Sequence, residues 1–481
     1  MIFNSLTYFL LLVLVVFFYW VLPYKARLLL IFSSSLVFYG FWRIEFIPVM
    51  LASVIVDYAV ALRMPDSSQA QKNRLLITSL CVNLGLLFYF KYLIFFAENA
   101  IGISNLIGAN IDPLALKIIL PLGISFYTFQ TISYTVDVYR GTIKPEKDFV
   151  LYACYVTFFP QLVAGPILRA VEIIHQFKKR PDFEWSNIAI GTRRIIYGLF
   201  LKVVLADNIS PLVDVGFAIP VETMSALDVW TLAFLFGFQI YFDFSAYSHI
   251  ALGSARLMGI CFPENFNFPY IATSPKDFWR RWHISLSSWI RDYLYLPIAK
   301  INSHDSSIGG LANATLDKGK NKSLFITWAI MGLWHGANWT FVIWGVFHSV
   351  VIFLYRLATP ITRNIDTRVK MVGGLLVTLP VMMLAWIPFR AESLSITISM
   401  WSKVFDPFSY ATLGMRENTY IVTTIILIGI MATYWVKTNL APLIERRGTL
   451  LLIVESLLFS LIVPFVIIFL RPVNQFIYFQ F

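Results

Sequence analysis

The sequence predicts an all-α protein that crosses a membrane many times, and three observations support this fold class. Of the 481 residues, 58% are hydrophobic and 14% are charged, whereas roughly 25% of an ordinary soluble domain is charged. Apolar runs of about 20 residues, long enough to cross a bilayer as a helix, recur along the chain. Aromatic residues make up 17% of the chain, and Trp and Tyr rings favour the membrane–water interface. We therefore expect one multi-spanning helical domain over residues 1–481, with about 10–12 spans.

The predicted spans follow one another with no low-complexity linker and no internal repeat. The first run, Leu6 to Leu22, has neither a basic region before it nor a small-residue cleavage site, so we interpret it as a retained span rather than a signal peptide. The predicted spans lie near residues 5–22, 27–43, 46–62, 75–97, 114–138, 195–214, 227–250, 371–390, 420–436 and 449–470.

The charge distribution predicts the orientation of the chain and argues against nucleic-acid binding. The formal net charge is +11, but Lys and Arg lie in short loops between apolar runs and form no long basic tract. Basic residues follow the first, third and fifth spans, at 25–27, 63–74 and 140–147. The loops near 98–113 and 215–226 contain no Lys or Arg. The positive-inside rule then places the N-terminus outside the cytoplasm.

One stretch interrupts the pattern of simple spans. Residues 149–167 contain Pro160, Gly165 and Pro166 and have basic residues on both sides, so we interpret this run as re-entrant. Non-helical backbone is tolerated at membrane depth only against protein or a water-filled cavity. An internal cavity is therefore expected.

A second stretch, 262–300, predicts an amphipathic helix on the cytoplasmic membrane surface. Its basic residues would either attract anionic lipid headgroups or bind a phosphate-bearing donor, for which Arg280 and Arg281 are the candidates. The apolar residues recur at steps of three and four: Trp279, Trp282, Leu286, Trp289, Tyr293 and Leu296. The accompanying basic residues are Lys276, Arg280, Arg281 and Arg291.

Polar side chains lie within two of the predicted spans. Interhelical hydrogen bonds that fix packing are one interpretation. The other is that these side chains line one polar cavity that holds substrate, with Gln130 and Asp243 as candidate binding residues. On the fifth span they are Tyr127, Gln130, Tyr134 and Asp137, and on the span near 227–250 they are Gln239, Asp243 and Tyr247.

His335 is the candidate catalytic residue among six histidines. It follows the basic residue Lys322 by 13 positions, which is about 20 Å of helical rise into a hydrocarbon core of about 30 Å. Residues 336–338 then permit a turn and the chain returns towards Arg356, so His335 is predicted near the tip of a helical hairpin. A neutral imidazole there suits a general base for a hydroxyl group, and Asn338 is a candidate hydrogen-bond donor to the resulting oxyanion.

The remaining candidates carry less chemistry. His348 lies in the returning apolar run and is expected to be a packed, hydrogen-bonded histidine rather than a catalyst. A lone histidine makes no metal site, and no nucleotide-binding fingerprint is present in a suitable context. Three scattered cysteines predict neither a disulfide framework nor a zinc site: Cys81, Cys154 and Cys261.

Five segments together resemble the membrane-bound O-acyltransferase family and, within it, the bacterial alginate O-acetyltransferase type. The resemblance covers about residues 115–350 at the level of motifs and the whole chain in length and span pattern. The segments are WHGANW with His335, FWRRWHISLSSWIRDYLYLPI with His283, YFDFSAYSHIALGSARLMGICFPENF, PLGISFYTFQTISYTVDVYRG and FFPQLVAGPI.

This resemblance implies a helical fold around a central funnel and tunnel, with His335 as the catalytic residue and His283 as a second functional position. It implies acyl transfer from a cytoplasmic thioester, either acetyl-CoA or an acylated carrier, with no bound cofactor or metal. It also implies a bacterial inner-membrane location in contact with membrane lipids and a periplasmic partner acetyltransferase. The implied acceptor is a polysaccharide such as alginate, although relatives also act on peptidoglycan, teichoic acid or cellulose.

The sequence departs from the family pattern in two places. Ala246 and His249 replace the Gly and Asp of a common F-D-F-S-G-Y-S-D segment, and residues 299–320 lack a common Gly-Gly-Asn-Arg segment. The second departure lies where a donor could dock, so it affects the donor more than the reaction class. The alternative function is a transporter or flippase that uses the same cavity. Such proteins often contain paired inverted repeats, and none is visible in this sequence.

Overall fold

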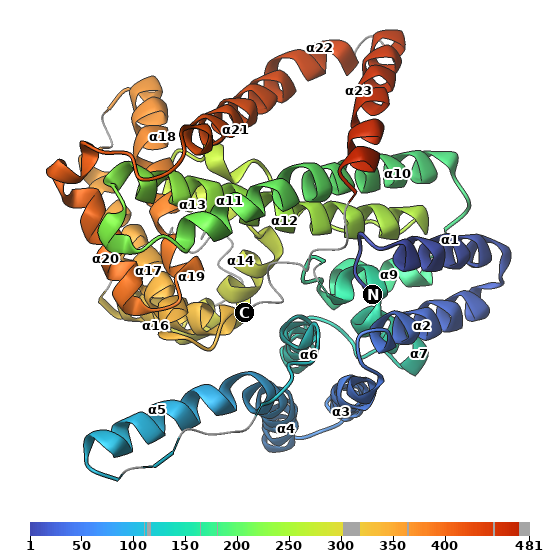
Figure 1. Ribbon diagram of the computed structural model, residues 1–481. Coiled ribbons are helices and arrows are strands. Elements are labelled where there is room, and N and C mark those ends of the chain that lie inside the picture. The colour runs from blue at the N-terminus through green and yellow to red at the C-terminus, as the bar shows by residue number, and fades with distance from the viewer. Residues whose placement is uncertain are drawn as a thin grey trace. The chain divides into compact units, whose positions relative to one another are not determined.

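The computed structural model describes residues 1–109, 111–112, 117–163, 165–179, 181–301, 318–362, 365–445 and 448–470. Over these residues every regular element is a helix and no strand is present (Figure 1), which confirms the all-α prediction. Most of the divergent loop at 299–320 lies outside the described residues. Six described helices are long and apolar enough to cross a membrane, and the protein is a multi-pass membrane protein: Ile44–Arg63, Gln69–Leu106, Ala226–Leu257, Trp339–Ile361, Thr367–Arg390 and Glu417–Ile444.

The described chain divides into two compact units. The N-terminal unit contains the described residues of 1–195 and 247–263, and the C-terminal unit contains those of 196–246 and 264–480. Helix α12 (Ala226–Leu257) contributes its first part to the C-terminal unit and its last part to the N-terminal unit. Of the seven predicted site residues, Gln130 alone belongs to the N-terminal unit.

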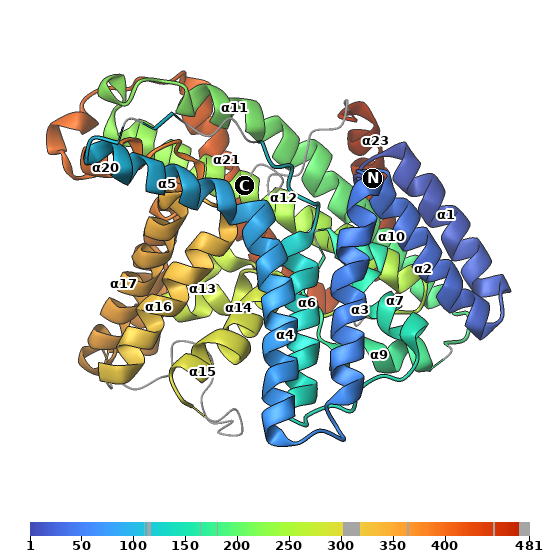
Figure 2. The ribbon, with the colours of Figure 1, turned by 90° about the horizontal axis from the view of Figure 1, so that it is seen from below.

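The N-terminal unit is built around helix α6, whose side chains are nearly all buried. Figure 2 shows α3, α4 and α6 side by side. The helices of this part of the chain are α1 (Leu6–Val21), α2 (Tyr24–Gly40), α3 (Ile47–Arg63), α4 (Gln69–Leu87), α5 (Leu93–Leu106), α6 (Ile124–Tyr139), α7 (Phe149–Thr157), α8 (Phe159–Leu162), α9 (Ala170–Lys178) and α10 (Trp185–Leu199).

A buried polar network joins α3, α4 and α6. The Asp57 carboxylate accepts hydrogen bonds from Ser79 Oγ at 2.5 Å and from Asn83 Nδ2 at 2.7 Å. The side-chain oxygen of Asn83, Oδ1, in turn accepts from Ser53 Oγ at 2.5 Å and from Thr131 Oγ1 at 3.1 Å. Because all five side chains are buried, these bonds tie three helices together in a setting where water cannot replace them. Sequence analysis did not single out this network.

The predicted interruption at 149–167 is present as two short helices. Helix α7 ends at Thr157, α8 begins at Phe159, and the backbone of Phe158 between them is non-helical, with φ −50° and ψ 112°. Nearly every described side chain from Leu151 to Leu168 is buried within the protein. The break agrees with the expectation that non-helical backbone in this run is covered by protein, and its re-entrant path remains a prediction.

The C-terminal unit contains the long helical hairpin and the helices around it. Short 3-10 and π-helical turns connect several of them, including the π-helical turn η3 (Phe200–Ala206) that precedes α11. The helices are α11 (Asp207–Phe217), the first part of α12, α13 (Pro275–Arg281), α14 (Ile284–Ile290), α15 (Leu296–Ile298), α16 (Lys318–His335), α17 (Trp339–Ile361), α18 (Thr367–Leu384), α19 (Ile387–Arg390), α20 (Leu394–Phe405), α21 (Glu417–Trp435), α22 (Ala441–Glu445) and α23 (Gly448–Ile468).

Helices α16 and α17 form the predicted hairpin and pack closely against each other. Two glycines allow this approach. A Cβ on Gly332 would lie 2.2 Å from the carbonyl oxygen of Phe341, and a Cβ on Gly345 would lie 2.0 Å from the carbonyl oxygen of Trp328. Small residues at a helix interface let two backbones meet in this way. The arrangement holds His335, the last residue of α16, against the first turns of α17.

The prediction of one amphipathic helix over 279–296 is wrong. Helix α13 ends at Arg281, Trp282 is extended, and His283 has a left-handed φ of 40° before α14 begins. The apolar stripe is instead buried inside the protein, with Trp282 2% and Leu286 1% exposed. Periodic spacing identified the buried residues, but it could not reveal a helix break that depends on contacts with distant residues.

Candidate functional site

His335 lies at the tip of the α16–α17 hairpin, in an aromatic environment. Its side chain is 4% exposed. The imidazole meets the edges or faces of three rings at centroid distances of 4.9 Å (Trp334), 4.8 Å (Trp344) and 5.1 Å (Phe389). The position at the hairpin tip matches the prediction. These rings keep bulk water away from the imidazole and hold its plane, as a general base in a dry site requires.

Asn338 has a structural role at the same tip. It is the N-cap of α17, and its side-chain oxygen accepts a hydrogen bond from the Thr340 backbone N–H at 3.0 Å. Such a cap satisfies one of the unpaired N–H groups at a helix start. The Asn338 side chain is exposed, in contrast to the buried His335. Its role as an oxyanion donor stays a prediction.

His283 is fully buried, and its orientation is set by Asn265. His283 Nδ1 lies 3.1 Å from Asn265 Oδ1, and that oxygen also accepts from the Ser285 backbone N–H at 3.2 Å. The backbone donor identifies this atom as the amide oxygen, so Nδ1 carries the proton and Nε2 has a free lone pair. Within the described residues, His283 Nε2 has no hydrogen-bond partner. Burial lowers the pKa of His283 to about 3, which keeps the ring neutral.

Sequence analysis missed Asn265, although the residue lies in one of the segments that carried the family resemblance. A stretch of backbone hydrogen bonds holds it beside His283, because Ile284 N donates to Asn265 O at 3.0 Å and Asn267 N donates to Arg281 O at 2.9 Å. The feature that could have drawn attention to Asn265 is an amide side chain two residues after Pro263, and the structure shows that this side chain is buried in a loop. Its partner, however, lies 18 residues away, and local patterns do not report such pairs.

The two predicted histidines belong to one aromatic cluster. Trp344 contacts His335 and lies 6.4 Å from Trp386. Trp386 lies 4.7 Å from Trp282, the residue that precedes His283. The structure therefore places His335 and His283 in the same unit, joined through three buried indole rings.

Asp243 is one of two carboxylates that pair with the buried Lys202, a grouping that the sequence did not reveal. Lys202 Nζ lies 2.8 Å from Asp243 Oδ1 and 2.8 Å from Asp207 Oδ1. Lys202 is 2% and Asp243 3% exposed. Lys202 lies on the π-helical turn η3, and such turns are frequent at functional sites. A charge this deep requires a partner of opposite sign, which accounts for Asp243 whether or not it also touches substrate.

The basic residues of α13 are not equivalent. Arg281 is held by Asp277, with Nε 2.9 Å from Oδ1, and it also donates to the Asn267 carbonyl oxygen at 3.2 Å. Arg280 is exposed. Partial burial and the nearby charge of Arg280 lower the pKa of Lys276. A carboxylate therefore offsets the charge of Arg281, and Arg280 presents its side chain at the surface.

Gln130 lies on α6 in the N-terminal unit and is 2% exposed. Its side-chain oxygen has no hydrogen-bond partner in the described part of the chain. Its backbone oxygen accepts from Tyr155 Oη at 3.1 Å. The buried Tyr127 and Tyr152 lie in the same unit. The side-chain oxygen of Gln130 can therefore accept a further hydrogen bond, which agrees both with a packing role and with a contact to substrate.

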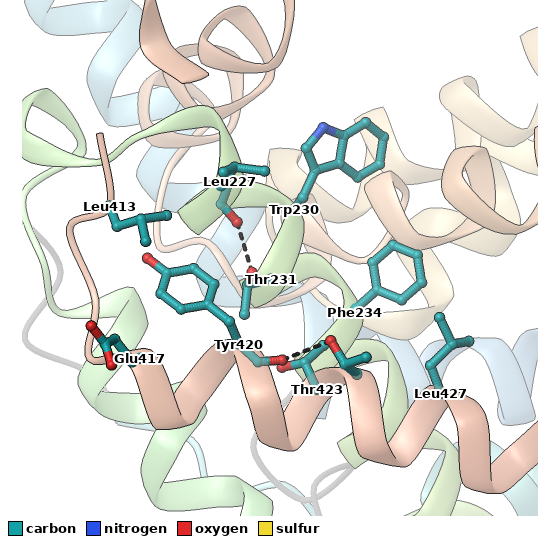
Figure 3. A pocket seen from close by; sticks show the side chains of 10 residues that line it. Leu227, Trp230, Thr231, Phe234, Leu413, Glu417, Tyr420, Thr423 and Leu427 are labelled. Atoms are coloured by element: carbon teal, nitrogen blue, oxygen red, sulfur yellow. Dashed lines mark hydrogen bonds between the residues drawn. The ribbon is translucent and has the colours of Figure 1, made fainter. Parts of the chain in front are cut away.

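A groove of about 540 Å³ lies in the C-terminal unit, between the first turns of α12 and α21 (Figure 3). The figure shows Trp230 and Phe234 of α12 facing Tyr420 and Leu427 of α21. Its lining is mostly apolar, and it contains none of the seven predicted site residues. Among the described residues, no three His, Cys, Asp or Glu side chains gather closely enough to hold a metal ion. The histidine cluster remains the candidate site.

Comparison with known proteins adds a family match and several relatives. The pattern of the MBOAT, membrane-bound O-acyltransferase family, matches residues 146–389. The chain is 36% identical to the Probable alginate O-acetylase AlgI of Azotobacter vinelandii, over 87% of this chain and 81% of that protein. It is 36% identical to the Peptidoglycan O-acetyltransferase of Helicobacter pylori, over 75% and 70%. It is 29% identical to the Teichoic acid D-alanyltransferase of Bacillus subtilis, over 49% and 58%.

Proposed function

Because the chain belongs to the membrane-bound O-acyltransferase family, we propose that it moves an acetyl or related acyl group from a cytoplasmic thioester to an extracytoplasmic acceptor. The family makes the protein an O-acyltransferase rather than a transporter. The observation that supports the proposed chemistry is the buried His335 at the hairpin tip, against the rings of Trp334, Trp344 and Phe389.

His335 acts as the general base in this proposal. A ring nitrogen accepts the proton of the acceptor hydroxyl while the hydroxyl oxygen attacks the thioester carbonyl carbon. The new C–O bond forms, the carbonyl oxygen carries negative charge in the tetrahedral intermediate, and the C–S bond then breaks. The imidazolium returns the proton to the sulfur, so the products are an ester and a free thiol. The aromatic surroundings exclude water that would otherwise hydrolyse the thioester.

His283 supports the donor end. Because Asn265 fixes the proton on Nδ1, the Nε2 atom is an acceptor that can hold an N–H or O–H group of a bound substrate. Burial keeps the ring neutral through its effect on the pKa, so His283 does not compete with His335 for the proton during transfer. Its contribution is the position of a substrate, and a change there should appear in KM.

The donor carries phosphate and binds near Lys276 and Arg280 in this proposal. Acetyl-CoA and an acylated carrier both bring a phosphate group, and guanidinium groups recognise phosphate in bidentate fashion. Arg280 is exposed, whereas Arg281 is engaged with Asp277. The competing source of the same chemistry is the anionic lipid headgroup. Donor binding that persists in uncharged detergent supports the first source.

The acceptor is a polysaccharide or a partner acetyltransferase that passes the acyl group to one. Relatives over most of this chain are named for alginate and for peptidoglycan O-acetylation, and both acceptors are carbohydrate polymers outside the cytoplasm. We propose alginate-like O-acetylation in a bacterial inner membrane, together with a periplasmic partner enzyme. A partner that co-purifies with the protein and carries the acyl group would support this arrangement.

The activity test uses the purified protein in lipid nanodiscs. Acetyl-CoA or an acetylated carrier protein is supplied with an alginate oligosaccharide, and free thiol is measured against time. We expect thiol release that depends on the acceptor and ceases in the His335→Gln variant. Thiol release from neither donor, with a protein that remains folded, would contradict the proposal.

The orientation has its own test. Reporters inserted in the loop between α3 and α4, at residues 64–68, and after Gly108 should report opposite sides of the membrane. The first loop follows Arg63, and the run that contains Gly108 has no Lys or Arg from 98 to 113. Reporters on the same side would contradict the predicted topology with the N-terminus outside.

A further inference from the structure

Four aromatic side chains of the C-terminal unit form a closed cluster next to His335. They are Trp279 of α13, Trp328 of α16, and Trp344 and His348 of α17. Every pair among the four is in ring contact, with centroid distances from 4.7 Å to 6.1 Å. Trp344 also contacts His335 at 4.8 Å, so the cluster and the proposed base share one indole ring.

The ring nitrogens of this cluster are buried without hydrogen bonds. The four side chains are between 1% and 7% exposed. Within the described residues, none of the indole nitrogens of Trp279, Trp328 and Trp344 has a partner, and neither does Nδ1 or Nε2 of His348. The prediction that His348 is packed is therefore confirmed, whereas the prediction that it is hydrogen-bonded is wrong for the described part of the chain.

Several buried ring nitrogens without hydrogen-bond partners in one cluster are typical of a ligand-binding site. A buried N–H group without an acceptor destabilises the folded protein, so native proteins retain few of them, and those few are often functional. The half-buried Trp401 of the same unit is satisfied, because its Nε1 donates to the Leu384 carbonyl oxygen at 3.1 Å, whereas Trp386 Nε1 resembles the cluster nitrogens in having no partner among the described residues. The cluster instead holds three indole nitrogens and an imidazole that face no protein acceptor.

The chemistry of these groups selects the ligand. An indole N–H donates and cannot accept, and a neutral imidazole donates through one nitrogen and accepts through the other. Donors therefore outnumber acceptors by four to one, which suits an oxygen with two lone pairs. The side chains of the cluster present uncharged indole faces, which suit a small neutral group better than a phosphate or carboxylate. A carbonyl oxygen on a short acyl chain has these properties.

We propose that Trp279, Trp328, Trp344 and His348 bind the carbonyl oxygen of the acyl group that is to be transferred. This inference rests on the proposed function and gives it a second set of residues, one of which, Trp344, also contacts His335. When the acceptor oxygen bonds to the carbonyl carbon, the carbonyl oxygen becomes negative, and the same N–H donors then hold it until the C–S bond breaks and the carbonyl re-forms. Donors aimed at this oxygen are worth about 10²–10³-fold in rate.

The test measures the carbonyl group directly. Protein with His335→Gln, in which turnover is blocked, is loaded with acetyl-CoA that carries ¹³C at the thioester carbonyl, and the ¹³C=O stretch is recorded by difference infrared spectroscopy. We expect a shift to lower frequency relative to free acetyl-CoA. The shift should diminish when Trp328→Phe or His348→Leu is added, because each removes ring nitrogens while keeping an apolar side chain. Adding Trp401→Phe, the matched control, should leave it unchanged.

Activity and stability give an independent reading in protein that retains His335. His348→Leu should lower acceptor-dependent thiol release by about 10²-fold while the melting temperature stays the same or rises, because it removes two unsatisfied nitrogens. If His348 were only packed, His348→Leu would change neither the activity nor the stability of the protein. If His348 were hydrogen-bonded within the protein, the substitution would lower stability more than activity.

The outcomes separate this inference from the proposed function. If wild-type protein releases thiol from acetyl-CoA but the bound carbonyl stretch equals that of the free thioester, the cluster does not bind the carbonyl. The same conclusion follows if the shift survives Trp328→Phe and His348→Leu, since ordered water would then occupy the cluster. If wild-type protein consumes neither acetyl-CoA nor an acetylated carrier protein, the donor in the proposed function is wrong and this inference fails with it.

Discussion

Replacing His335 with Gln should remove most acyl transfer while leaving the protein folded in the membrane. Glutamine retains much of the side-chain volume and can still donate and accept hydrogen bonds, but it cannot take up a proton at neutral pH. Loss of a general base typically lowers the rate by about 10²–10⁴-fold. That range corresponds to about 2.7–5.5 kcal/mol in the activation barrier.

The effect of His335→Gln on the free energy of unfolding can be compared with this change in the activation barrier. His335 makes ring contacts with Trp334, Trp344 and Phe389, and an aromatic pair contributes roughly 0.5–1.5 kcal/mol beyond its buried area. His335→Gln should therefore lower the free energy of unfolding by a few kcal/mol at most. Because turnover is expressed per folded molecule, this loss does not imitate the loss of a base.

The assay compares His335→Gln with Phe389→Leu in nanodiscs. Phe389→Leu removes one ring contact with His335 but no proton acceptor, so it should lower the melting temperature while retaining turnover within about tenfold. Folded protein is quantified by its melting transition, and acceptor-dependent thiol release is then measured. If His335→Gln turns over within twofold of the unaltered protein, His335 is structural and the base must be sought elsewhere.

The remaining predictions concern charge. Arg280→Ala and Arg281→Ala should each raise KM for the phosphate-bearing donor, because each removes a guanidinium that can bind phosphate, and unchanged donor affinity in both variants would exclude a donor site there. Lys202→Met should lower the free energy of unfolding by about 3–5 kcal/mol, because it leaves the Asp243 carboxylate buried without its cation, and thermal unfolding that shows no loss contradicts the buried pair. Burial lowers the pKa of His283 from its ordinary value of 6.5 to about 3, so as the pH falls the unfolded chain binds a proton before the folded protein does. Stability should fall as pH drops below about 6.5, by up to about 1.4 kcal/mol per unit, and a denaturant titration series should show a shallower fall for His283→Gln.

Several features of the site could be predicted because they are local. The α16–α17 hairpin follows from two apolar runs on either side of Gly-Ala-Asn, and the last residue of the first helix is necessarily at its tip. The burial of Trp279, Trp282 and Leu286 could be predicted from their spacing at three and four residues, although the single helix that this spacing implies is broken at Trp282 and His283. Which surface covers that face is not contained in the spacing, and here it is protein rather than lipid.

Other features depend on residues that meet only when the helices pack. The left-handed turn at His283 is held by Asn265, 18 residues earlier in the chain, and the carboxylate of Asp243 is explained by Lys202 on a different helix. In the sequence, each of these polar residues is a single polar side chain in an apolar run, with no indication of the partner that offsets its burial. Their partners could not be assigned because several polar residues were available and only the helix packing selects among them.

Four features could be read from the sequence without the structure: a composition typical of membrane proteins, the helical runs, the hairpin whose first helix ends at His335, and the family motifs. Tertiary structure alone decided the proton position on His283, the buried ion pair of Asp243 and the four-ring cluster around His348. The physical reason is the range of the interactions. Hydrophobic periodicity acts between neighbours along a helix, whereas hydrogen bonds and ion pairs need atoms within about 3 Å of each other, a distance that only the packed chain sets.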